Sequence, residues 1–60
     1  GQMTLEEYKQ KVRKCLIDMH NYTPEEADKL TATYNDDFEE ALYDFNWPPN
    51  VMAGAMIFGY

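Results

Sequence analysis

The first part of the chain places its apolar residues at steps of three and four. They are Leu5, Tyr8, Val12, Cys15, Leu16 and Met19. Charged residues fill most positions between them, so one face of a helix is apolar and the opposite face is solvated. Thr4 precedes this stretch and Glu7 lies three residues later, which is the spacing of a capping box. The pattern predicts a helix over residues 5–19.

Two more helices are predicted in the middle of the chain. The run Thr23-Pro24-Glu25-Glu26 combines an N-cap, a proline at the first helical position and a capping-box glutamate, and it predicts a helix that ends near Tyr34. Asp36 is the expected cap of the next helix, and the pair Pro48-Pro49 stops the chain from continuing it. The apolar face of that helix is expected to consist of Phe38, Ala41, Leu42 and Phe45.

The segment 51–58 is the most apolar part of the chain. With Asn50 as its cap it predicts a short helix, which Gly54 weakens and Gly59 ends. This helix either completes the core of one chain or packs against a second copy to form a homodimer through residues 51–58, and the sequence leaves both interpretations open. No strand pattern or internal repeat is present. The expected fold is all-α, a small three-helix bundle with a short fourth C-terminal helix.

The composition is that of one small domain, with 60 residues, 45% of them apolar, and one cysteine. No internal disulfide can form, and one Cys with one His cannot make a closed structural zinc site, so no cofactor is expected. Residues 1–60 are taken as a single helical domain, and Gly1-Gln2 before Met3 are expected to be a cloning remnant. Helix packing or self-association therefore has to supply the stability of the domain.

Charge is distributed unevenly along the chain, whose net charge is −6. Residues 1–14 hold four basic and two acidic side chains, a net charge of +2, whereas residues 15–60 hold one basic and nine acidic side chains, a net charge of −8. Nucleic acids bind basic surfaces, so direct nucleic-acid binding is not expected and a basic protein partner is. No secretion signal or membrane span is predicted, and the free cysteine indicates the cytoplasm.

Two clusters have a chemical interpretation and a simpler one. Cys15 and His20 have the chemistry of a nucleophile and a base, but no third group orients them, and a buried, unreactive cysteine on the apolar face is expected. The acidic residues from Asp36 to Asp44 lack the glycine of a calcium loop and are expected to form the solvated start of a helix. No acid–base pair, phosphate loop or metal set is recognised, so the chain is expected not to be an enzyme.

The run from Leu16 to Ala27 resembles the start of a ubiquitin-associated (UBA) domain, which has an apolar helix, a Met-Gly-aromatic loop and a capped second helix. The loop Met19-His20-Asn21-Tyr22 departs from this pattern by one extra residue and by having no glycine. Further positions at offsets similar to the family's second and third helices are Leu30, Phe38, Ala41 and Leu42. The resemblance covers about residues 12–46 and implies a three-helix fold that binds ubiquitin. The ubiquitin-binding residues that it implies are Met19, Tyr22, Leu42 and Phe45.

The C-terminal part resembles small prophage and Firmicutes proteins of no assigned activity, which end in a Trp-Pro turn and an Ala/Met helix. Tyrosine and tryptophan are common at interface hot spots, and Tyr43 lies off the apolar face, beside acidic residues. The favoured hypothesis is a non-enzymatic, acidic protein-interaction module. The alternatives are a phage-type acidic inhibitor that mimics nucleic acid on a basic partner, and a UBA-like ubiquitin-binding domain. The residues expected to bind the partner are Met19, Tyr22, Asp36, Asp37, Glu40, Tyr43, Asp44 and Trp47.

Overall fold

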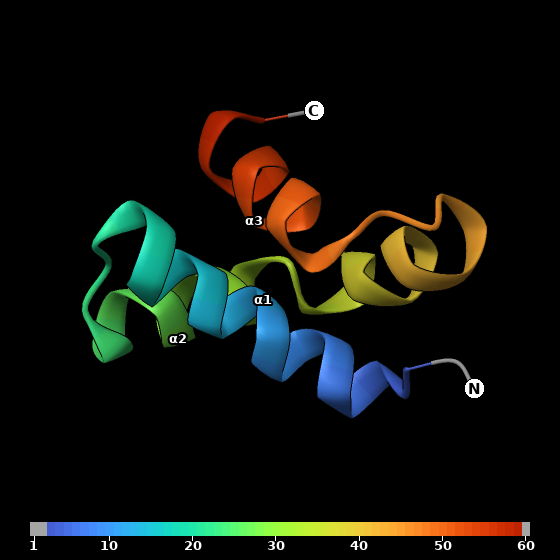
Figure 1. The fold of residues 1–60 in the computed structure, drawn as a ribbon, viewed down its shortest axis with the longest axis horizontal. Coiled ribbons are helices and arrows are strands. Elements are labelled where there is room, and N and C mark those ends of the chain that lie inside the picture. Colours follow the sequence, from blue (N-terminus) through green and yellow to red (C-terminus); the bar gives the residue numbers. More distant parts are fainter. Residues whose placement is uncertain (1–2, 60) are drawn as a thin grey trace.

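Helix α1, Leu5–His20, runs through the middle of the molecule, and the later helices pack against it (Figure 1). The computed structural model describes residues 3–59, so Gly1-Gln2, the expected cloning remnant, and Tyr60 lie outside the described residues. Helices α2, Pro24–Thr33, and α3, Pro49–Phe58, both contact α1. The all-α fold with a C-terminal helix is confirmed, and residues 3–59 contain no strand. None of the helices in this part of the chain has the length and apolar character that a membrane span requires.

Both predicted capping boxes form. At the start of α1 the backbone N–H of Glu7 donates to Thr4 Oγ1 at 3.1 Å, and the backbone N–H of Thr4 donates to Glu7 Oε1 at 3.2 Å. Thr23 and Glu26 exchange the same two bonds at α2. These bonds satisfy N–H groups that have no partner within the helix. The bond from the Thr4 backbone also lowers the pKa of Glu7, because it stabilises the carboxylate.

The segment between α2 and α3 differs from the predicted third helix. It consists of a 3-10 turn η1, Asn35–Asp37, and a π-helical segment η2, Glu40–Asp44, and neither begins with a side-chain cap bond. The prediction that Asp36 caps a helix is therefore wrong. The backbone N–H of Phe45 donates to the carbonyl of Glu40, five residues earlier, at 3.0 Å. Because a π turn holds more residues than an α turn, Phe45 rotates off the predicted apolar face and is 48% exposed.

A short connector turns the chain between α1 and α2. Asn21 ends α1 in the left-handed conformation, with φ 59°. The next backbone N–H, that of Tyr22, donates to the carbonyl of Leu16 at 3.0 Å, and Pro24 then begins α2. Asparagine adopts the left-handed conformation more readily than most residues. Asn21 therefore takes the left-handed position that glycine occupies at the ends of many other helices.

A second connector of the same design precedes α3. Asn46 has φ 55°, and the backbone N–H of Trp47 donates to the carbonyl of Ala41 at 2.9 Å. Pro48 occupies the N-cap position and Pro49 the first position of α3, where a missing N–H costs nothing. The sequence Asn–aromatic–X–Pro thus occurs twice with one geometry, so the expectation that the chain has no internal repeat does not hold for this short motif.

Helix α3 begins earlier than predicted, because the second proline starts the helix instead of only stopping the preceding one. Asn50 lies inside α3 and is not its cap, contrary to the prediction. Gly59 ends the helix as predicted, with φ 86°, and its N–H donates to the carbonyl of Ala55 at 2.8 Å.

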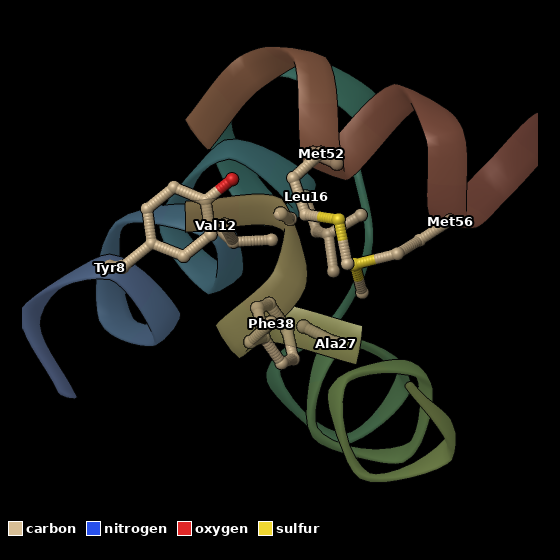
Figure 2. Close-up of a cluster of buried hydrophobic side chains, with 9 residues drawn as sticks. Tyr8, Val12, Leu16, Ala27, Phe38, Met52 and Met56 are labelled. Atoms are coloured by element: carbon tan, nitrogen blue, oxygen red, sulfur yellow. The ribbon is translucent and has the colours of Figure 1, made fainter. Parts of the chain in front are cut away.

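The apolar core forms where α1, α2, η2 and α3 meet (Figure 2). Its buried side chains are Tyr8, Val12, Leu16, Ala27, Phe38, Ala41, Met52, Ala53 and Met56. The members from α1 are four residues apart and form one stripe. Helix α3 supplies three of the buried residues, so the C-terminal segment completes the core of a single chain.

Tyr8 connects α1 to the second connector. Its ring meets that of Phe38 edge to face, with centroids 6.2 Å apart and an interplanar angle of 81°. Its hydroxyl donates to the carbonyl of Trp47 at 2.8 Å. Trp47 is half-buried and packs against the core, so it folds back on the bundle. Burial raises the pKa of the Tyr8 hydroxyl, because the interior disfavours the phenolate.

Candidate protein-interaction surfaces

Acidic side chains from η1 and η2 line one shallow hollow of about 330 Å³, which we call the acidic hollow. Its lining residues are Asp36, Glu39, Glu40, Tyr43 and Asp44. Four of the eight residues predicted to bind a partner are therefore brought together. Glu39 was not among the predicted residues, although its position three residues after Asp36 and four before Tyr43 is the signal that would have found it.

No basic side chain among residues 3–59 forms an ion pair with the carboxylates of the acidic hollow. The ion pair that the described residues do contain joins Arg13 Nε to Asp28 Oδ1 at 2.7 Å, on the α1–α2 side. Lys9 Nζ donates to Asn35 Oδ1 at 2.9 Å and lies 5.9 Å from the centre of the Phe38 ring. The carboxylates of the hollow are thus available as acceptors for the N–H groups of lysine or arginine.

The hollow offers carboxylates and one aromatic ring. Within the described part of the chain, no group of three or more His, Cys, Asp or Glu side chains is arranged to hold a metal ion. Tyr43 is 50% exposed at the hollow and offers an aromatic ring with a hydroxyl. Asp37 is half-buried and does not line the hollow. The arrangement suits charge-assisted hydrogen bonds around one aromatic contact.

Trp47 and Phe45 form a separate aromatic pair next to the hollow. Their ring centroids are 4.9 Å apart, with an interplanar angle of 36°. Trp47 contacts the core, so much of its ring is already used inside the chain, whereas Phe45 is largely outside it. Trp47 is predicted to bind a partner, but it also holds the second connector in place through its contacts with the core and with Tyr8.

A second surface lies between α1 and the start of α3, and we call it the α1–α3 groove. It has a volume of about 470 Å³ and is lined by Lys11, Lys14, Cys15, Asp18, Met19, Pro49 and Asn50. Cys15 is half-buried and packs against the core at the edge of this groove, so it is less buried than predicted. Met19 is 61% exposed, so the prediction that it lies on a buried face is wrong. The reason is that Cys15 and Met19 lie along one edge of the apolar stripe, beside the groove, whereas Leu16 faces the core and is fully buried.

The residues implied by the UBA resemblance lie in different surroundings. Tyr22 and Leu42 are half-buried and pack against the core, and Phe45 contacts Trp47. Met19 lines the α1–α3 groove with Pro49. Comparison with known proteins finds no matching family model, no similar curated protein and no similar solved structure. The functional argument therefore depends on the surfaces of the chain itself.

Proposed function

We propose that the chain is a non-enzymatic protein-interaction module that binds a basic surface of a partner protein through the acidic hollow. The observation that carries the proposal is that Asp36, Glu39, Glu40 and Asp44 line one hollow with Tyr43 and have no ion-pair partner among residues 3–59. Carboxylates that stabilise a fold are commonly paired or used as caps, as Glu7 and Glu26 are here.

The charge distribution supports the same proposal. Residues 15–60 carry a net charge of −8, and the hollow concentrates four of their nine acidic side chains on one side of the molecule. The negative electric potential around such a cluster speeds the encounter with a basic partner and disfavours acidic partners. Tyr43, with half of its surface exposed, supplies the type of ring that dominates interface hot spots. We propose a cytoplasmic location, where Cys15 stays reduced.

The proposal is tested by NMR titration of the labelled chain with oligo-arginine and oligo-lysine peptides. Amide shifts are expected to concentrate in residues 36–44 and to shrink steeply as salt is added. The variant Asp36→Asn, Glu40→Gln, Asp44→Asn keeps the shape of the hollow and should lose these shifts. The matched control removes three exposed acids elsewhere, with Glu6→Gln, Asp18→Asn and Glu25→Gln. Equal loss in the two variants would show that only net charge matters, and would overturn the proposal.

A nucleic-acid mimic is a more specific form of the same function. Asp36, Glu40 and Asp44 are spaced four residues apart, and a row of carboxylates along a helical segment is what a mimic of a phosphate backbone requires. A partner captured from the native host would then be released by competing DNA or RNA. A partner that stays bound in excess nucleic acid, yet still depends on the hollow, favours ordinary protein recognition.

Ubiquitin binding is the third candidate, and the exposed Met19 at the end of α1 favours it. Titration of the labelled chain with ubiquitin should then move the amides near Met19, Tyr22 and Leu42. An unchanged spectrum at millimolar ubiquitin rules this candidate out without affecting the acidic hollow.

A further inference from the structure

Helix α3 presents an uncharged, apolar outer face to solvent. Val51 is 42% exposed and Phe58 is 82% exposed, and Gly54 and Ala55 lie between them, half-buried. These four positions are three or four residues apart, so they share one side of the helix. The buried residues of α3 occupy the opposite side, toward α1. In Figure 1, α3 lies at the edge of the molecule.

Gly54 has no explanation within a single chain. It lies in the middle of α3, where glycine destabilises a helix relative to alanine. Its backbone is helical, and a Cβ added to it would meet no atom within 4 Å. Neither a special backbone conformation nor a close neighbour therefore requires glycine at this position. The remaining physical use of a glycine here is to let another backbone approach the helix closely.

We propose that the outer face of α3 pairs with the same face of a second copy of the chain, with the two helices antiparallel. Positions 51, 54, 55 and 58 are symmetric about the midpoint between residues 54 and 55. In a two-fold arrangement Val51 therefore packs against the partner's Phe58, and Gly54 lies opposite the partner's Ala55. A two-fold interface has to be self-complementary in this way, with each large residue facing a small or medium one.

Charge selects a second copy as the occupant. The chain carries a net charge of −6, but α3 contains no charged residue, so two copies can meet at this face without placing like charges together. A strongly charged partner would leave charges unpaired against Val51 and Phe58.

The pairing is weak and concentration-dependent. A helix of ten residues is about 15 Å long, and its face is smaller than the roughly 800 Å² per partner of a standard stable interface. The dimer therefore forms at high chain concentration and exchanges rapidly. It uses a different surface from the acidic hollow, so the two proposals stand or fall separately.

The oligomeric state tests this proposal, measured by sedimentation equilibrium in reducing buffer from micromolar to millimolar chain. The unsubstituted chain is expected to shift from monomer to dimer over this range. Gly54→Gln should raise the melting temperature of the monomer, because it replaces glycine in a helix interior, and should still abolish the dimer by blocking close approach. Phe45→Glu, at an exposed aromatic residue outside α3, is the matched control for Phe58→Glu. The Phe45 variant should dimerise normally and the Phe58 variant should not.

A monomer at every concentration overturns the proposal, as does dimerisation that Gly54→Gln leaves intact. The register is tested by mixing two single-cysteine chains in a Cys15→Ser background, one with Val51→Cys and one with Phe58→Cys. Antiparallel pairing predicts that oxidation joins the two different chains far more than it joins identical ones, as read by mass spectrometry. Mostly identical pairs, or no cross-linking above a denatured control, would contradict the antiparallel face.

Discussion

Replacing Tyr8 by phenylalanine isolates the bond that joins α1 to the second connector. The ring stays in the core against Phe38, and only the hydroxyl that donates to the carbonyl of Trp47 at 2.8 Å is lost. A hydrogen bond of this kind contributes about 1 kcal/mol to folding, because water replaces both partners in the unfolded chain. This bond is part-buried, so the larger penalty of a fully dry acceptor is not applied.

The expected change in melting temperature follows from the length of the chain. Unfolding entropy of about 2.1 cal/mol/K per residue amounts to roughly 0.13 kcal/mol/K for 60 residues. A loss of about 1 kcal/mol should then lower the Tm by about 8 °C. Thermal unfolding followed by circular dichroism and by the fluorescence of Trp47 measures this shift. Tyr22→Phe is the matched control, since Tyr22 is also half-buried on the core but its hydroxyl has no hydrogen bond to residues 3–59.

Two results would refute this reasoning. One is an unchanged Tm in Tyr8→Phe, and the other is an equal decrease in Tyr22→Phe. The raised pKa of Tyr8 adds a test at alkaline pH. Because the folded pKa lies above the unfolded value of about 10, the contribution of Tyr8 is complete below that pH and is lost as pH rises through the folded pKa. Tyr8→Phe should therefore lose less stability than the unsubstituted chain over the same alkaline range.

Three further predictions follow from burial, backbone geometry and capping. Met56 is buried and Phe58 is exposed. Met56→Ala should therefore lower the free energy of unfolding by about 2–5 kcal/mol, whereas Phe58→Ala should change that of the monomer by less than about 0.5 kcal/mol. Equal effects of the two variants in urea unfolding would contradict the assigned faces of α3. Asn21→Gly should be tolerated and Asn21→Val should cost about 1–2 kcal/mol, measured the same way, because a β-branched residue resists the left-handed conformation. Glu7 has a lowered pKa, so its contribution to stability is present above the unfolded value of 4.5 and is lost as pH falls. Glu7→Gln should accordingly reduce the loss of stability between neutral and acid pH, and an unchanged acid profile would rule out this contribution.

The parts of the fold that depend on local signals could be predicted from the sequence. Thr4 and Thr23 mark two helix starts because a cap involves residues only three positions apart. The π segment could not be predicted, because the extra residue per turn is set by how Phe38 and Trp47 both reach the core around it. The exposure of Met19 could not be predicted for a related reason. Helical spacing puts Met19 close to the stripe of Tyr8, Val12 and Leu16, but it does not show how wide a strip of α1 the other helices cover.

The acidic hollow was partly predictable. Asp36, Glu40 and Asp44 are four residues apart, a spacing that an α-helix brings to one side, and the 3-10 turn and π segment found instead still place all three at the hollow. Met19 and Tyr22 were expected to join them, but the first connector holds these residues at the end of α1. The α1–α3 groove had no signal in the sequence, because it depends on the position of the Pro48-Pro49 turn against α1.

The central position of α1 also determines when during protein synthesis this chain can fold. The helix is made first, yet its stripe of Tyr8, Val12 and Leu16 is covered by residues translated much later, and the bond from Tyr8 to Trp47 spans 39 positions. At roughly 5–20 residues per second, the stripe stays uncovered for about 2–8 s. During that interval the charged residues between the apolar positions are what keep a nascent α1 from aggregating. Substituting Lys11 or Lys14 by apolar residues is therefore expected to lower the yield of folded protein more than its melting temperature.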